Sequence, residues 1–198
     1  MTRISVANLV AEVTNTSTNQ SFVVGFLNRK SISRGDPAYT ALGGAALLTS
    51  DAMLLLADKY GAVFEKGNDA RFHVTDADAD QVLQMLEGRD HKLIELSLER
   101  EMREELCGLE LPGQEEPVLL ESDLDSAAYI FLKHVRQISD EAADEAIHRL
   151  FFLYEMKLPD HVFKKLAGNQ YIKLLSADEI LKGRSTDGKK IGGNLGLM

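Results

Sequence analysis

The sequence predicts an α/β fold with a mixed sheet in a single domain, residues 1–198, and three observations support this. Apolar segments of strand length recur along the chain, at residues 22–27, 40–48 and 127–135. Helical periodicity appears between them, at residues 52–60, 76–87 and 98–106. The chain has 198 residues, 44% of them hydrophobic, which is enough to build one substantial core.

The N-terminal part begins with polar residues and continues with two strands. Residues 1–20 are rich in Thr and Asn after a short apolar start, so we expect a loosely held lead-in. Residues 22–27 predict a strand. A turn containing Gly and Asp precedes Pro37, and the next strand is expected at residues 40–48.

The middle of the chain predicts a helix, a hairpin and a second helix. Residues 52–60 have the apolar content of a short helix, and residues 66–69 have the turn composition that joins two antiparallel strands. Residues 76–87 form an amphipathic helix with Val82, Met85 and Leu86 on the inward face.

The C-terminal part continues with strands and a capped helix. We expect strands at residues 127–135 and 148–157, with Ser139 as a helix N-cap between them. Ser176 and Glu179 match the S-x-x-E capping box, which predicts a helix after a strand near residue 171. The glycine-rich segment from about residue 183 predicts a flexible tail.

Composition excludes several classes of protein. The net charge of −9, from 22 basic and 31 acidic residues, argues against a general nucleic-acid-binding surface. No apolar run has the length of a membrane span, so we expect no membrane partner. One cysteine, Cys107, suits a reducing, cytoplasmic location and is expected to be a small buried residue. The five histidines lack zinc-site spacing.

Three carboxylates share one face of the helix expected around residue 102. At about 100° per residue, Glu101, Glu104 and Glu105 fall within an arc of about 100°. Like charges at this spacing repel by about 0.2–0.5 kcal/mol per pair, and a hard divalent cation would reverse that repulsion. The spacing therefore indicates a candidate metal site.

An ordinary ion-paired helix explains the same residues. Glu99 with Arg103, and Arg100 with Glu104, are opposite charges four positions apart. The apolar ridge of Leu98, Met102 and Leu106 would then bury one side and leave a solvated charged surface. Spacing alone favours this second interpretation.

The run Arg-Glu-Met-Arg-Glu-Glu at 100–105 resembles the core of the Nudix box, G-x5-E-x7-R-E-U-x-E-E-x-G-U. Gly108 resembles the closing glycine, displaced by one residue, and Gly43-Gly44 resembles the glycine pair that opens the box. Lys92 stands at the position of the box glutamate, and Glu95 lies three residues later. The distance from Gly44 to Arg100 implies an insertion at residues 50–92.

The resemblance implies a Nudix-like α/β/α sandwich with an inserted helix–hairpin–helix element. It implies metal-dependent hydrolysis of a nucleoside diphosphate linked to another moiety. Mg²⁺ or Mn²⁺ would be held by Glu101, Glu104 and Glu105, and Arg100 would orient Glu101. Gly43 and Gly44 would complete the site, and the partner would be a small nucleotide-derived substrate.

Several points stay open at this stage. Acidic residues after the box are candidates for a general base: Glu121, Asp140, Glu141, Asp144, Glu145 and Glu155. The incomplete box leaves a catalytically weakened module that binds a nucleotide or protein partner as an alternative. An interaction domain without any nucleotide is a third. The oligomeric state is undecided, with a homodimer as one candidate.

Overall fold

The computed structural model describes the whole chain except residues 110, 112 and 142–144, and it leaves undescribed the side chains of 140, 141 and 145. Across the described residues the fold is mixed α/β, with ten strands in a mixed sheet and seven α-helices. The chain divides into two compact units. Three strands of 14 residues contribute to both units: β1 (Thr2–Asn15), β7 (Ala128–Glu141) and β8 (Glu145–Leu158).

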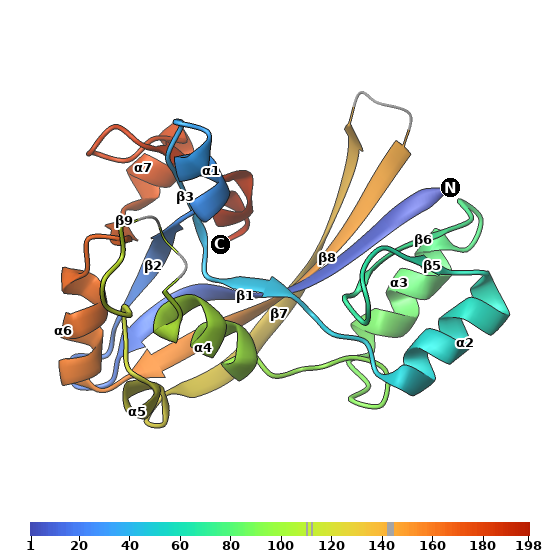
Figure 1. Cartoon of the computed structure of the whole chain (residues 1–198), viewed down its shortest axis with the longest axis horizontal. Helices are drawn as coiled ribbons and strands as arrows, with labels where there is room; N and C mark the ends of the chain where they lie inside the picture. The colour runs from blue at the N-terminus through green and yellow to red at the C-terminus, as the bar shows by residue number, and fades with distance from the viewer. Residues whose placement is uncertain (110, 112, 142–144) are drawn as a thin grey trace. The chain divides into compact units, whose positions relative to one another are not determined.

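Unit 1 consists of Met1–Asn8, Gly44–Ser97 and Lys133–Leu153. Its own elements are α2 (Ser50–Tyr60), β5 (Val63–Phe64), β6 (Arg71–Val74) and α3 (Ala79–Glu87), and β4 (Gly43–Ala45) enters it. β6 pairs antiparallel with β1, where Thr2 lies opposite Val74, and β5 pairs with β6. Figure 1 shows α2 and α3 beside these strands.

The core of unit 1 joins the first residues of the chain to the predicted insertion. Ile4 and Val6 of β1, Phe72 of β6 and Leu86 of α3 are all 0% exposed. Thr49 caps α2 by accepting a hydrogen bond from Ala52 N, and Gly61 ends the helix with φ of 60°. Residues 50–92 do form a helix, a hairpin and a helix, but they share one core with β1.

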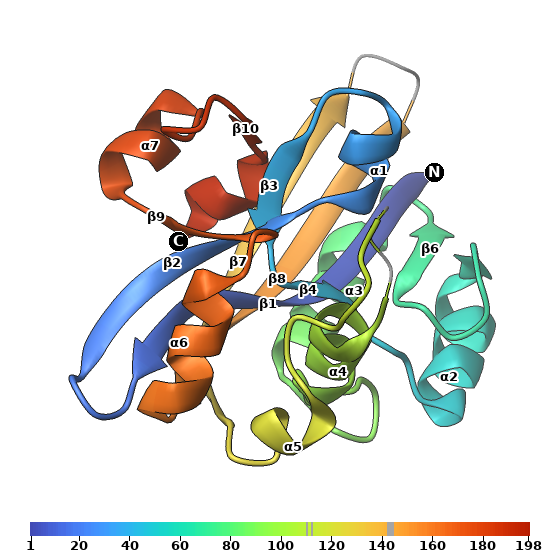
Figure 2. The ribbon, with the colours of Figure 1, turned by 60° about the vertical axis from the view of Figure 1, so that its left-hand side comes forward.

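Unit 2 consists of Leu9–Gly43, Leu98–Leu132 and Tyr154–Met198. β2 (Gln20–Leu27) is central, since it pairs antiparallel with β1, β3 and β9. β10 joins β3 in parallel, which makes the sheet mixed. The remaining elements, seen in Figure 2, are α1 (Arg29–Ser33), β3 (Ala38–Ala41), α4 (Glu99–Cys107), α5 (Glu121–Leu124), α6 (Asp160–Gly168), β9 (Ile172–Leu175), α7 (Ala177–Lys182), β10 (Lys190–Ile191) and the 3-10 helix η1 (Gly193–Leu197).

Two expectations about the chain ends differ from the structure. Residues 1–20 hold the whole of β1 rather than a loose lead-in, because apolar residues such as Val6 and Val10 lie in the core and even Asn8 is fully buried. The glycine-rich tail, predicted as flexible, pairs through β10 with β3 and buries Leu195 completely. Both segments depend on partners distant in sequence.

Other elements agree with the sequence or correct it locally. Ser176 and Glu179 form the predicted capping box of α7. Ser139 does not cap a helix, since it lies near the end of β7. Helix α6, absent from the sequence-based assignment, packs on β2, with the rings of Phe22 and Phe163 5.4 Å apart. No helix among the described residues is long and apolar enough to cross a membrane.

Candidate functional site

Helix α4 carries the Arg-Glu-Met-Arg-Glu-Glu run and is anchored by the predicted ridge. Leu98, Met102 and Leu106 are 1%, 0% and 0% exposed. Leu106 O accepts a hydrogen bond from Leu119 N at 2.9 Å, which satisfies a carbonyl near the helix end. The buried ridge fixes the rotation of α4, and with it the directions of the three glutamates.

Arg100 lies between two of these glutamates. Its Nη2 is 2.5 Å from Oε1 of Glu101, and its Nη1 is 3.1 Å from Oε1 of Glu104. Glu101 is buried, with 9% of its side chain exposed, whereas Glu104 is 57% exposed. The expected salt bridge between Arg100 and Glu101 is therefore present, and so is the i,i+4 pair of the ion-paired interpretation.

Glu105 meets the glycine pair. The backbone N–H of Gly43 donates to Oε2 of Glu105 at 2.7 Å, across 62 positions of sequence. Gly43 has φ of 123°, a conformation that residues with a Cβ rarely adopt. The structure thus brings together Glu105 and the first glycine of the pair. Gly44 follows directly and begins the next segment of unit 1.

A cavity of about 500 Å³ lies beside Glu105 in unit 2. Its wall carries two basic residues, Arg29 and Lys30, on the short helix α1. The remaining lining residues are Phe26, Asn28, Thr40, Glu105 and Leu111. The size is within the range of small-molecule sites, about 300–1,000 Å³. Sequence reasoning did not find this cavity, because its residues come from four separate segments.

The charge at the cavity contrasts with that of the whole protein. Among the described lining residues, Arg29 and Lys30 against Glu105 give a charge balance of +1 (2 − 1), in a chain whose net charge is −9. Polar Asn28 and Thr40 add hydrogen-bonding groups, and Phe26 and Leu111 add apolar surface. The cavity therefore combines what a ligand with an anionic group and an apolar ring requires.

The three glutamates fit a hard cation in chemistry but not in arrangement. Carboxylate oxygens are the ligands that Mg²⁺ prefers. Glu101 and Glu104 are held by Arg100, and Glu105 by Gly43. Among the described residues, no three His, Cys, Asp or Glu side chains are grouped so as to hold a metal ion. We therefore assign no step of a reaction to a metal in this arrangement.

Arg103 forms a network that the sequence indicated only in part. The expected pair with Glu99 is present, with Nη2 2.8 Å from Oε1. Arg103 also pairs with Glu121 of α5, and its Nη2 lies 2.8 Å from Oδ1 of Asp125. These hydrogen bonds, led by the one that Arg103 donates to Asp125, raise the pKa of Arg103. The network ties α4 to α5.

Two other residues compared with the box pattern, Lys92 and Glu95, belong to unit 1, whereas α4 belongs to unit 2. Glu95 belongs to unit 1, where its N–H donates to Leu47 O at 2.7 Å and its carbonyl accepts from Asn8. Lys92 is exposed, and its carbonyl oxygen accepts a hydrogen bond from the Thr49 hydroxyl. These two residues serve the fold of unit 1 through their backbones.

The structure shows interaction partners for two of the candidate general bases, Glu121 and Glu155. Glu121 is paired with Arg103. Glu155 accepts a 2.6 Å hydrogen bond from the Thr14 hydroxyl. Asp144 lies outside the described residues, and so do the side chains of Asp140, Glu141 and Glu145. Cys107 is half-buried; burial first, then the charge of Glu121, raises the pKa of its thiol to about 11, which disfavours a reactive thiolate.

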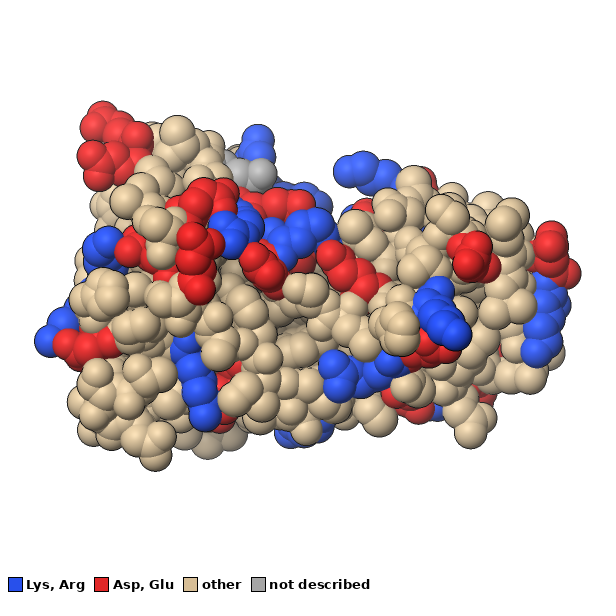
Figure 3. Space-filling model, turned by 90° about the horizontal axis from the view of Figure 1, so that it is seen from below, with Lys and Arg blue, Asp and Glu red and all other residues tan. Residues whose placement is uncertain are grey.

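Surface charge on the face drawn in Figure 3 is interleaved. Acidic and basic side chains lie next to one another there, and the described side chains form no broad basic area on that face. This distribution agrees with the many short-range ion pairs of the chain, such as Lys164 with Asp160 and Lys182 with Asp178. A polyanionic surface such as duplex nucleic acid is attracted by clustered basic residues instead.

Comparisons with known proteins do not assign the chain. No family model matches it, and neither the curated proteins nor the solved structures contain a match. A function can therefore be inferred only from the residues themselves, above all from those around Glu105.

Proposed function

We propose that the protein binds a nucleoside diphosphate linked to another moiety in the cavity beside Glu105, and hydrolyses its phosphoanhydride bond with Mg²⁺ or Mn²⁺. The observation that carries this proposal is the hydrogen bond from Gly43 to Glu105. It joins the two motifs that resemble parts of the Nudix box, although 62 positions separate them. A Nudix-like sandwich fold and a cytoplasmic location belong to the same proposal.

Binding of the substrate falls to the residues of the cavity. Arg29 and Lys30 attract the phosphates, because their positive charges line the cavity of a protein whose net charge is −9. Phe26 and Leu111 offer apolar surface to a base. Asn28 and Thr40 provide the polar groups that fix the orientation of a ligand.

Two carboxylates of α4, those of Glu105 and Glu101, have different roles in this proposal. Glu105 lines the cavity, is held in place by Gly43 and is the acidic side chain among the described lining residues. Arg100 holds Glu101 in a buried ion pair, which limits its rotation. The dependence on Mg²⁺ or Mn²⁺ comes from the resemblance to the Nudix box alone, because in the structure Arg100 and Gly43 hold the three glutamates.

A second candidate function is binding without turnover, as a nucleotide-binding module. It is favoured by the engagement of Glu101 and Glu104 with Arg100 and by the absence of a grouped metal set among the described residues. The cavity and its basic residues serve this function equally well. An ion-paired interaction domain without a nucleotide is the third candidate.

The test is a panel of nucleoside diphosphate derivatives assayed for cleavage with Mg²⁺ and with Mn²⁺, together with thermal denaturation. Arg29→Gln combined with Lys30→Gln should raise KM by about tenfold or more, because hydrogen bonds to charged groups contribute about 1.5–3 kcal/mol each. Arg34→Gln is the matched control, an exposed basic residue of the same segment outside the cavity.

The outcomes separate the candidates. Cleavage that depends on the metal and on Arg29 and Lys30 supports hydrolysis. A nucleotide that raises the melting temperature without being cleaved supports the binding module. If no nucleotide is cleaved and none shifts the melting temperature, both nucleotide functions are wrong and the interaction domain is left.

A further inference from the structure

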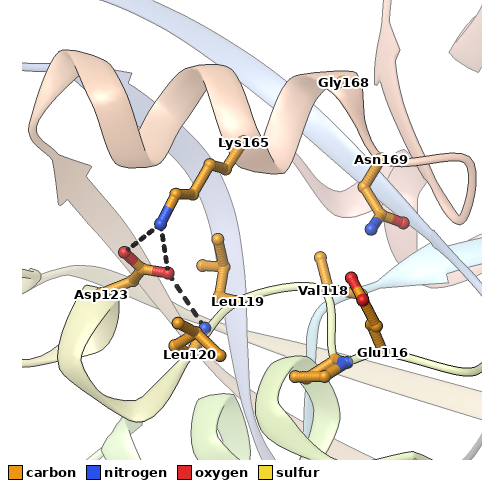
Figure 4. A pocket seen from close by; sticks show the side chains of 9 residues that line it. Glu116, Val118, Leu119, Leu120, Asp123, Lys165, Gly168 and Asn169 are labelled. Carbon is orange, nitrogen blue, oxygen red and sulfur yellow. Dashed lines mark hydrogen bonds and ion pairs between the residues drawn. The ribbon is translucent and has the colours of Figure 1, made fainter.

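A second cavity, of about 620 Å³, lies elsewhere in unit 2, between α6 and the loop that leads into α5 (Figure 4). Of the residues that the structure describes, none lines both this cavity and the one beside Glu105. Its lining residues are Glu116, Pro117, Val118, Leu119, Leu120, Asp123, Lys165, Gly168 and Asn169. Apolar and charged groups are both present, and neither the fold nor the proposed hydrolysis uses the space between them.

One wall of this cavity is fixed by a buried carboxylate. The side chain of Asp123 is 8% exposed and accepts hydrogen bonds from Lys165 Nζ at 2.8 and 3.0 Å. The Leu120 N–H donates to the same carboxylate at 3.0 Å. Burial opposes ionisation of Asp123, but the bonds from Lys165 and Leu120 lower its pKa. Lys165 is thereby held at the cavity with half of its side chain exposed.

A second hydrogen-bond donor, Asn169, directly follows the last residue of α6. The Tyr171 N–H donates to Oδ1 of Asn169 at 3.0 Å, which fixes which end of the amide is the acceptor. The NH₂ group of Asn169 therefore faces the opposite way. Figure 4 shows Lys165 on α6, and Asn169 just after the end of α6, both directed toward the loop that carries Val118 and Leu119. Both residues line the cavity.

The charges of the cavity select among ligands. Lys165 contributes +1, and Asp123 and Glu116 contribute −1 each, so the local balance is −1 (1 − 2). A multiply charged phosphate would be repelled by the two carboxylates. A ligand with one anionic and one cationic group would match both the two donors and the carboxylate of Glu116. Val118 and Leu119, 5% and 1% exposed, form an apolar floor.

We propose that this cavity binds a small zwitterionic amino-carboxylate, with its carboxylate on Lys165 and Asn169, its ammonium group on Glu116 and its apolar body on Val118 and Leu119. The class includes free α-amino acids. The site does not depend on nucleotide hydrolysis, since its residues are separate from those around Glu105.

The experiment is isothermal titration of the full-length protein with L-leucine and the other proteinogenic amino acids, followed by N-acetyl-leucine and leucinamide. At least one free amino acid should bind. Its N-acetyl derivative, which lacks the ammonium group, and its amide, which lacks the carboxylate, should bind at least about tenfold more weakly. Equal binding of either derivative would overturn the zwitterion assignment.

Two near-isosteric variants test the residues without removing the buried ion pair. Asn169→Asp keeps the acceptor for Tyr171 N but replaces the cavity-facing donor, and Glu116→Gln removes the charge expected at the ammonium group. Each should weaken binding at least about tenfold. Lys164→Gln, on the same helix outside the cavity, should bind as the wild type does. Unchanged affinity in both test variants, or no binding by any amino acid at millimolar concentration, would overturn the proposal.

Discussion

The backbone N–H of Gly43 donates to the carboxylate of Glu105 at 2.7 Å. This bond joins the first residue of β4 to the helix that carries the acidic run. Gly43 makes it with a φ of 123°, which residues with a Cβ rarely adopt.

Gly43→Ala should therefore lower both stability and nucleotide binding. A Cβ at this φ strains the backbone by about 1–3 kcal/mol. The strain would be relieved by moving the N–H away from Glu105. Urea denaturation measures the first effect and a nucleotide titration the second. Gly193→Ala is the control, since a Cβ there meets nothing within 4 Å and no positive φ is required; it should change stability by less than about 0.5 kcal/mol.

Glu101→Gln should be more destabilising than an exposed substitution of the same kind. The carboxylate is buried and paired with Arg100, so removal of its charge leaves a partly buried guanidinium without its closest partner. We expect a loss of about 1–3 kcal/mol. Glu104→Gln, at a side chain 57% exposed, should cost less than about 1 kcal/mol. Equal losses in the two variants, measured by urea denaturation, would contradict this assignment of burial.

Replacement of residues 51–90 by a Gly/Ser loop should abolish the cooperative unfolding transition of unit 1. The sequence indicates an insertion at residues 50–92. In the structure, Phe72 and Leu86 share a core with Ile4 and Val6, so the deletion would expose strand residues that are 0% exposed now. Circular dichroism during heating provides the measurement. A deletion protein that keeps the wild-type melting temperature would show that β1 is stable without residues 51–90.

The capping box of α7 should make stability depend on acid pH. Hydrogen bonds from Ser176 N, first, and from Thr186 N lower the pKa of Glu179 from 4.5 to about 2. Because the folded-state pKa is depressed, the stabilisation is complete above the unfolded-state value of about 4.5. It is lost as pH falls toward 2. The urea midpoint of the wild type should fall over this window more than that of Glu179→Gln, and parallel curves would contradict the assignment.

Binding of Mn²⁺ should depend on the exposed carboxylate of α4. Glu104 pairs with Arg100 at the surface, so an ion can compete for it at little cost in stability. Calorimetric titration should show that Glu104→Gln binds Mn²⁺ at least about tenfold more weakly than the wild type, while Glu99→Gln, on the same helix, should not. Equal binding by wild type and Glu104→Gln would show that Glu104 does not bind the metal ion.

The sequence predicted the elements whose signals are local. Helix α2 and the capping box of α7 were found because caps and apolar periodicity lie within a few residues of each other. The ridge of Leu98, Met102 and Leu106 was found for the same reason. The acidic run identified α4 as the candidate site before its partners were known.

The missed features depend on distant partners. Residues 1–20, rich in Thr and Asn, predict a loosely held lead-in, yet they hold β1, in which Asn8 and Asn15 are buried. The cavity beside Glu105 draws on residues from 26 to 111, which no spacing rule connects. Helix α6 did leave a signal that could have been used: Pro159 before its first turn, then Val162, Phe163 and Leu166 on one face.

The most direct test of the proposed function is the rate of phosphoanhydride cleavage by Glu105→Gln and by the wild type, measured on the nucleotide panel with Mg²⁺ and Mn²⁺. Glutamine can still accept the hydrogen bond from Gly43 N, so the fold should be kept while the charge beside the phosphates is lost. We expect metal-dependent cleavage by the wild type and a loss of about 100-fold or more in the variant. If the variant cleaves as fast as the wild type, or if the wild type cleaves no member of the panel with either metal, the assignment of hydrolysis to this site is wrong.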